Sequence, residues 1–246
     1  MPAQDARPAA GDGAARLRVW PGTGDLSAAC GAVLLLHGGR AEGWDPVPRA
    51  SLPAARMRPF GRALARAGIL AGAPVVVAEV RYRRRGWNGE RADPARDAAG
   101  ALTELAALAP GLPVVLVGHS MGARAGLRVL DRPGVRGLVA LAPWWPPDEP
   151  IGRPTGRWVT ALHDERDRVT DARATWAALE RLGAAGARAV GVSMPRGRHA
   201  MLRDAGRWHR AAVTAAGAAL GWWPEPTAWP GPARRFGPRR DGRIGA

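Results

Sequence analysis

Residues 113–130 read PVVLVGHSMGARAGLRVL and carry the most informative pattern in the chain. The apolar run at 113–117 is typical of a strand that is buried on both faces. The residues that follow, 120–131, predict a helix. Gly118 and Gly122 flank Ser120, and the lack of Cβ atoms there lets strand and helix approach closely. The stretch therefore predicts a strand, a sharp turn that presents Ser120, and a helix.

Strands and helices alternate on both sides of this stretch. The other predicted strands are 16–20, 32–36, 74–82, 135–141, 158–162 and 187–193, and the other predicted helices are 54–67, 93–109, 171–182 and 200–220. Strands separated by helices pair in parallel through right-handed crossovers, because a tight hairpin cannot join parallel strands. The fold class that follows is α/β, with a mostly parallel central sheet flanked by helices.

Three segments of the 246 residues differ in composition. Residues 1–15 are small, polar and rich in Pro and Gly, which predicts a disordered leader. Residues 16–222 carry the alternating pattern of one domain, and 223–246 read as an irregular basic tail. The start of the chain has no signal-peptide core, and no segment has about 20 consecutive apolar residues. We therefore expect a cytoplasmic protein without a membrane span.

The formal net charge is +15, and all 36 basic residues are arginine. A strongly basic chain raises the possibility of nucleic-acid binding. Arg, Ala, Gly, Pro and Trp share GC-rich codons, however, so genome composition explains much of this excess, and we expect no specific nucleic-acid partner. Cys30 stands alone, so neither an intrachain disulfide nor a Cys-based zinc cluster is expected, and no metal site is predicted.

The pentapeptide GHSMG at 118–122 fits G-x-S-x-G, the turn that exposes a nucleophilic serine between strand and helix. A serine hydroxyl is protonated near neutral pH, so Ser120 needs an adjacent base to become a nucleophile. His199 is the candidate, since PRGRHAML at 195–202 directly follows a predicted strand and reaches the same edge of the sheet.

A histidine that acts as a general base needs a carboxylate to fix its tautomer. The loop HDERDRVTD at 163–171 follows the strand at 158–162. We favour Asp167 and keep the other carboxylates of this region as alternatives, namely Asp164, Glu165, Asp171 and Asp148. Asp171 also reads as the N-cap of the next helix.

Two further groups of residues are expected at the carboxyl ends of the strands, where parallel sheets bind ligands. His37-Gly38-Gly39-Arg40 offers flexible backbone, and one of its N–H groups, together with the N–H of Met121, would form an oxyanion hole. The candidates for substrate binding are Trp87, Asn88, Trp144 and Trp145.

Taken in order, these elements resemble the α/β-hydrolase family: HGG after one strand, GHSMG after another, D-R-V in a later loop and G-R-H near the end. The resemblance covers about residues 16–220 and implies an α/β-hydrolase fold. It implies that Gly39 and Met121 hold the oxyanion. It also favours Asp167 over Asp164, because the family places its acid just before a short apolar step. The usual cap is reduced to the loop around Trp144 and Trp145.

The expected function is therefore serine hydrolysis of an ester or related acyl bond through a Ser-His-Asp triad and an acyl-enzyme. A small acyl substrate is implied, and no cofactor is needed. One alternative is a thioesterase or acyltransferase that acts on carrier-linked acyl groups. Another is a non-catalytic binding protein with the hydrolase fold, although such a module has no need of all three groups.

Overall fold

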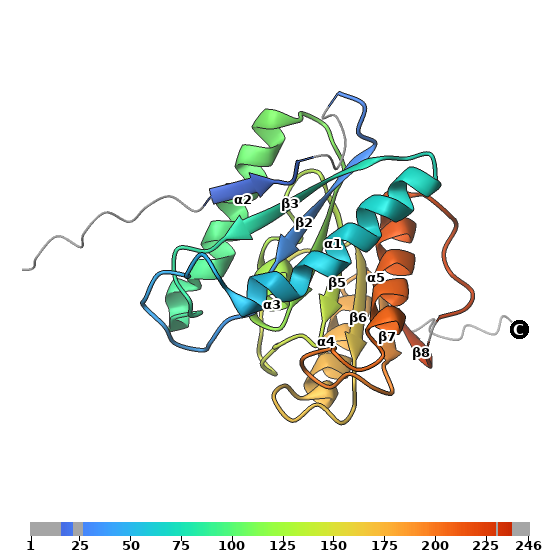
Figure 1. The fold of residues 1–246 in the computed structure, drawn as a ribbon. Helices are drawn as coiled ribbons and strands as arrows, with labels where there is room; N and C mark the ends of the chain where they lie inside the picture. The colour runs from blue at the N-terminus through green and yellow to red at the C-terminus, as the bar shows by residue number, and fades with distance from the viewer. Residues whose placement is uncertain (1–15, 22–26, 230, 238–246) are drawn as a thin grey trace, which may run out of the picture.

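A single sheet of eight strands organises the computed structural model, which describes residues 16–21, 27–229 and 231–237 (Figure 1). Its strand order is β1-β3-β2-β4-β5-β6-β7-β8. The strands are β1 Arg16–Val19, β2 Gly31–Leu36, β3 Val75–Arg81, β4 Val114–His119, β5 Val135–Leu141, β6 Trp158–His163, β7 Arg188–Ser193 and β8 Ala233–Phe236. The inner strands run parallel, whereas β1 and β8 pair antiparallel at the two edges. This confirms the predicted fold class.

Helices cover both faces of the sheet. They are α1 Leu52–Leu70, α2 Asp93–Leu108, α3 Met121–Arg128, α4 Ala172–Ala184 and α5 Ala205–Leu220, with a short 3₁₀ turn at Gly89–Arg91. α1 and α5 pack on one face, and α2, α3 and α4 pack on the other (Figure 1). Strand β2 shows the consequence, because all six of its residues are buried.

Alternate residues of β2 point to the two faces, as expected for a pleated strand. Leu34 and Leu36 belong to the apolar cluster shared with α2 and α3. Val33 and Leu35 belong to the cluster shared with α1 and α5. The continuous apolar run in the sequence therefore reflects burial on both faces rather than on one.

Polar side chains fix the starts of two helices. Ser51 Oγ accepts a hydrogen bond from the Ala54 N–H at 3.4 Å at the start of α1. Asp171 accepts from the Arg173 N–H at 2.8 Å at the start of α4, which confirms its predicted capping role. Such a cap contributes about 1 kcal/mol to helix stability.

The C-terminal region is more ordered than its composition indicates. Ala233–Phe236 forms β8, which pairs antiparallel with β7. A side chain at Gly217 of α5 would overlap the Trp223 ring, so the chain packs closely there as well. The prediction of an irregular tail is therefore wrong for these four residues, because backbone pairing with β7 does not depend on the composition that suggested a loop. The predicted leader, 1–15, and residues 238–246 lie outside the described residues.

The carboxyl ends of the parallel strands meet at the lower edge of the sheet in Figure 1, where the predicted site residues lie. The connection between β5 and β6, residues 142–157, contains neither helix nor strand, which fits the predicted minimal cap. None of the helices in the described ranges combines the length and apolarity that a bilayer crossing requires.

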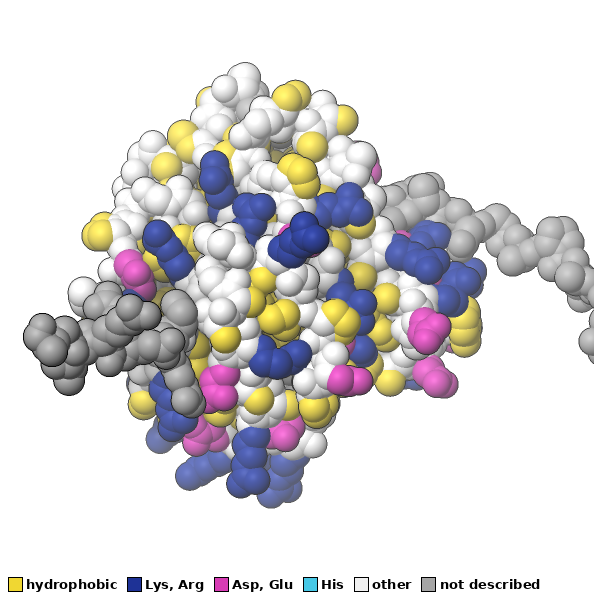
Figure 2. Space-filling view, turned by 180° about the vertical axis from the view of Figure 1, so that it is seen from behind, with side chains coloured by type: hydrophobic (Ala, Val, Ile, Leu, Met, Phe, Trp, Pro, Cys, Tyr) yellow, Lys and Arg dark blue, Asp and Glu magenta, His cyan; other side chains and the backbone are white. Residues whose placement is uncertain are grey.

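Arginine side chains are spread over the surface. On the face shown in Figure 2 they form several separate groups with acidic side chains among them. A single continuous basic stripe, the usual footprint of a nucleic-acid-binding surface, is not seen on that face. The expectation of no specific nucleic-acid partner stays a prediction.

Candidate active site

Ser120 sits in a strained turn between β4 and α3. Its backbone has φ +53° and ψ −116°, a conformation that costs a residue with a side chain about 1–3 kcal/mol. Two close approaches require the flanking glycines: a Cβ at Gly122 would overlap the Leu36 carbonyl oxygen, and one at Gly118 would lie 2.6 Å from the Ala123 Cα. The sharp turn therefore depends on the GHSMG pattern itself.

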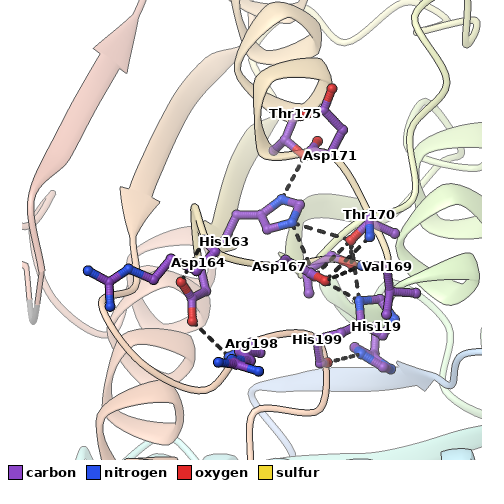
Figure 3. Close-up of polar contacts among 12 residues, drawn as sticks. His119, His163, Asp164, Asp167, Val169, Thr170, Asp171, Thr175, Arg198 and His199 are labelled. Carbon is purple, nitrogen blue, oxygen red and sulfur yellow. Dashed lines mark hydrogen bonds and ion pairs between the residues drawn. The ribbon is translucent and has the colours of Figure 1, made fainter.

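His199 and Asp167 meet at the same edge of the sheet. The Nδ1 atom of His199 lies 2.8 Å from Oδ2 of Asp167 (Figure 3). The loops that follow β6 and β7 bring them together across 32 residues of sequence. The Asp167 side chain is fully buried, whereas that of His199 is 17% exposed. The imidazole therefore has one nitrogen fixed by the acid and part of its ring open to solvent.

The surroundings of Asp167 keep its carboxylate charged. Burial alone would raise its pKa, but hydrogen bonds from His163, His199 and the Val169 N–H, together with the charge of His199, hold the pKa well below its usual range. Val169 N donates to Oδ1 at 2.8 Å, and Thr170 Oγ1 donates to Oδ2 at 2.9 Å. Asp167 is thus an ionised hydrogen-bond acceptor at neutral pH.

The other candidate carboxylates have different partners. Asp164 accepts hydrogen bonds from the backbone N–H groups of Arg166 at 2.9 Å and Arg198 at 2.8 Å, so it shapes the two loops. Asp171 caps α4, Glu165 accepts from the Ser193 hydroxyl at 3.2 Å, and Asp148 is exposed. Of the carboxylates considered from the sequence, only Asp167 contacts the His199 ring within the described residues.

His119, which precedes Ser120 in the turn, contacts His199. The Nε2 atom of His119 donates to the His199 carbonyl oxygen at 2.9 Å, and the two rings lie 4.8 Å apart. In the described part of the chain the Ser120 hydroxyl makes no hydrogen bond to His199. Such bonds are often long in a free enzyme and tighten when substrate binds.

Gly39 and Met121 lie in contact beside the turn. A Cβ at Gly39 would overlap the Met121 side chain, so the Gly39 backbone packs directly against that side chain. Among the described residues, neither backbone N–H donates to another protein group. A bridge between Arg40 and Gly86 fixes the loop that carries Gly39. One unused donor therefore directly follows Ser120, and the other lies in the loop that packs against Met121.

Three of the four predicted substrate-binding residues are packed inside the protein. Trp87 and Trp145 are each 2% exposed. Asn88 is also buried, where its Oδ1 accepts from the Gly43 N–H at 2.9 Å and its Nδ2 donates to Asp93 at 2.8 Å. All three have little exposed surface, and Asn88 is held by internal hydrogen bonds, so their role in substrate binding stays a prediction.

Trp144 is the half-buried member of that group and lies next to the turn. Its backbone N–H donates to the Ser120 carbonyl at 3.2 Å. The Arg124 guanidinium lies 4.6 Å from the Trp144 ring and 4.1 Å from the Trp87 ring. Arg124 also pairs with the buried Glu149 at 2.6 Å. This stack gives Trp144 a fixed position beside the nucleophile candidate.

A cavity of about 320 Å³ adjoins the loop that carries Gly39. Val47, Pro48 and Leu52 give it apolar walls, and Arg85 contributes a charge. Ser120 and His199 are not among its lining residues, so the cavity lies beside the serine rather than over it. Its size suits part of a small ligand.

Three residues near the site were not identified from the sequence: His119, His163 and Thr170. Thr170 bonds to Asp167, as described above, and His163 lies 3.4 Å from the same carboxylate oxygen. His119 holds the His199 backbone. Their place in the sequence could have indicated them, because each residue ends or follows a predicted strand, and ligands bind at that edge of a parallel sheet.

His119 also makes stability depend on pH. Burial, together with the charge of His199, lowers its pKa from 6.5 to about 3. Between these values the unfolded chain binds a proton that the folded chain does not, so stability falls as the pH drops. His119→Phe should reduce this slope by about 1.4 kcal/mol per pH unit, the value for one proton.

Urea denaturation of wild type and variant at pH 6.5, 5.5 and 4.5 measures the slope. Burial also lowers the pKa values of His37 and His209, which are present in both proteins. Their contribution to the dependence of stability on pH is therefore the same in wild type and variant. Equal slopes for the two proteins would contradict the assignment to His119.

Comparison with known proteins places this architecture in a family. Residues 33–240 match the model of the Alpha/beta hydrolase family. No curated protein sequence matches the chain.

Solved structures resemble the fold at low sequence identity. A putative alpha/beta hydrolase from Agrobacterium tumefaciens has a TM-score of 0.60 at 17% identity, over 84% of this chain and 92% of that one. Est1E from Butyrivibrio proteoclasticus has a TM-score of 0.59 at 12% identity, with coverages of 84% and 94%. A lidless serine hydrolase from Xanthomonas campestris has a TM-score of 0.53 at 20% identity, with coverages of 84% and 85%. Because the family match spans most of the sequence, the chain belongs to the alpha/beta hydrolase family.

Proposed function

We propose that the protein is a serine hydrolase that cleaves an ester or related acyl bond of a small molecule. The observation that carries the proposal is the 2.8 Å contact between His199 and the buried, ionised Asp167, one side chain away from the strained Ser120 turn. A structural histidine on the surface would not need a fully buried carboxylate. Membership in a hydrolase family supports the same conclusion.

In the proposed reaction Ser120 Oγ attacks the acyl carbon while His199 Nε2 takes the hydroxyl proton. Asp167 holds the imidazole in the required tautomer and stabilises its charged form. The backbone N–H groups of Gly39 and Met121 receive the oxyanion. The proton then passes to the leaving oxygen, and the acyl group stays on Ser120. Water, deprotonated by His199, releases the acid and regenerates the hydroxyl.

The shape of the site favours an open cleft over a deep tunnel. The 142–157 connection forms no helical lid, and the cavity beside Gly39 accepts part of the substrate. Trp144, whose backbone N–H contacts the Ser120 carbonyl and whose ring is half-buried, is the aromatic residue that we assign to substrate contact. A small acyl substrate fits these dimensions better than a polymer that must thread a tunnel.

The test is to label the full chain with a fluorophosphonate probe and then to assay p-nitrophenyl esters of graded acyl length beside matched thioesters. We expect one covalent label per chain and hydrolysis of at least the short esters. Turnover of thioesters alone would favour the thioesterase alternative. Absence of both labelling and turnover would favour a non-catalytic binding protein and overturn the proposal.

A further inference from the structure

A second histidine touches the buried carboxylate. His163 is the last residue of β6, and its side chain is fully buried. Its Nε2 lies 3.4 Å from Asp167 Oδ2, the oxygen that also receives His199, and 3.3 Å from the Thr170 hydroxyl. Its Nδ1 lies 2.8 Å from Thr175 Oγ1 in α4 (Figure 3). The ring thus bridges α4 and the acid loop.

The contacts of its two ring nitrogens decide the tautomer of His163. The Thr175 hydroxyl has one hydrogen and two acceptors within reach, His163 Nδ1 at 2.8 Å and the Asp171 carbonyl oxygen at 3.3 Å. These two contacts allow either direction, because a protonated Nδ1 could donate to Oγ1 while the hydroxyl donates to Asp171. The other ring nitrogen decides between them. Nε2 lies 3.4 Å from an oxygen of the ionised Asp167, and a lone pair there would be repelled. Nε2 therefore carries the ring proton, and the Thr175 hydroxyl donates to Nδ1.

We propose that His163 is a positioning residue, which donates its Nε2–H to Asp167 and aims the shared carboxylate oxygen at His199. The inference rests on the proposed function, because a positioning role needs a catalytic His199. Thr175 partners Nδ1 of the same ring, and α4 thereby becomes part of the support of the site.

Because Asp167 Oδ2 contacts both imidazoles, it also stabilises the protonated form of His199 less strongly. The donor from His163 takes part of the negative charge that would otherwise stabilise a protonated His199. Removing that donor should make protonated His199 more stable. The acidic limb of the kcat/KM profile should then move to higher pH.

Other charged groups near the two rings do not produce the same effect. His119, which faces His199, is kept neutral by its burial. Asp164, on the same loop as Asp167, is occupied by two backbone N–H groups. Asp171, at the start of α4, uses its carboxylate as a helix cap. Arg198 precedes His199 and is exposed, so solvent and salt screen its charge.

The experiment compares His163→Phe, which keeps a ring but removes both hydrogen bonds, with His163→Gln, whose amide restores a donor near Nε2. We expect His163→Phe to lower kcat about tenfold with KM nearly unchanged, as for loss of one hydrogen bond to a charged group. The acidic limb should move to higher pH. His163→Gln should recover most of kcat and return the limb toward the wild-type position.

A second pair of variants covers the case in which His163→Phe does not fold. Thr175→Val removes the hydroxyl that partners Nδ1 and so holds the ring in place, and Thr175→Ser keeps it. We expect the acidic limb of the kcat/KM profile to move to higher pH in Thr175→Val and to stay in place in Thr175→Ser. His209→Phe is the control for replacing a half-buried histidine, because His209 packs against Phe60 in α1, away from the site.

An unchanged limb in both His163→Phe and Thr175→Val, or equal losses for His163→Phe and His163→Gln, would overturn the inference. Proton NMR separates this result from failure of the proposed function. The signal of the His199 Nδ1–H should lie far downfield and should move in His163→Phe whether or not the enzyme turns over an ester. A signal that does not move contradicts the shared oxygen itself, while missing fluorophosphonate labelling of wild type contradicts the proposed function.

Discussion

Ser120→Ala is expected to abolish fluorophosphonate labelling and to lower kcat by several orders of magnitude, about 10⁶ when the nucleophile of a serine protease is removed. The physical reason is that the acyl-enzyme cannot form without the hydroxyl, while the oxyanion donors and the fold remain. Methyl in place of hydroxymethyl relieves no strain, because φ at residue 120 stays positive. Stopped-flow kinetics with an activated ester and gel-based labelling measure the two effects.

Ser193→Ala provides the matched control for this variant. Ser193 ends β7 and donates a hydrogen bond to Glu165 at 3.2 Å, outside the Ser120 turn. It should label and turn over like wild type. Retained labelling of Ser120→Ala would remove Ser120 from the mechanism.

Asp167→Asn is expected to nearly silence the enzyme while leaving the shape of the site intact. An amide in place of the carboxylate lacks the charge that stabilises protonated His199, and its N–H₂ group favours the wrong imidazole tautomer. The equivalent change in a serine protease lowers kcat about 10⁴-fold. Steady-state assays at saturating substrate measure the loss, and circular dichroism checks that the variant is folded.

Asp148→Asn is the control carboxylate, because Asp148 is exposed and lies on the β5–β6 connection. It should retain most of the activity. Asp164→Asn should also retain much of it, although one of its two backbone contacts is lost. If Asp164→Asn were as inactive as Asp167→Asn, the loop rather than the acid would account for the loss.

The elements that sequence periodicity predicted well are those with a continuous buried surface, either both faces of a strand or one face of a helix. The strand predicted at 135–141 is β5, Val135–Leu141, and the helix predicted at 93–109 is α2, Asp93–Leu108. Residues 200–204, predicted as the first turn of a helix, instead precede α5 in a loop where Met201 and Asp204 have positive φ. A buried face produces a periodic pattern of apolar residues in the sequence, whereas the residue at which a helix begins depends on local backbone geometry.

The parts of the site in which the chemistry restricts the residue type could be predicted from the sequence. The parts that depend on tertiary contacts could not. The Ser120 turn and the pairing of Asp167 with His199 follow from motif and strand order. The packing of Trp87 does not, because its partner Arg124 is 37 positions away on α3 and only the fold brings them together. His163 was missed for a similar reason, since its second partner, Thr175, lies on the next helix.

The central claim, that Ser120 carries the acyl group while the His199–Asp167 pair drives its transfer, is tested most directly by trapping the acyl-enzyme. The protein is mixed with a slowly deacylating ester, quenched in acid within the first turnovers, and analysed by intact and peptide mass spectrometry. The account predicts one added acyl group, mapped to the peptide that contains Ser120, and none in Ser120→Ala. Ester turnover with no acylated peptide, or with the acyl group on another residue, would contradict it.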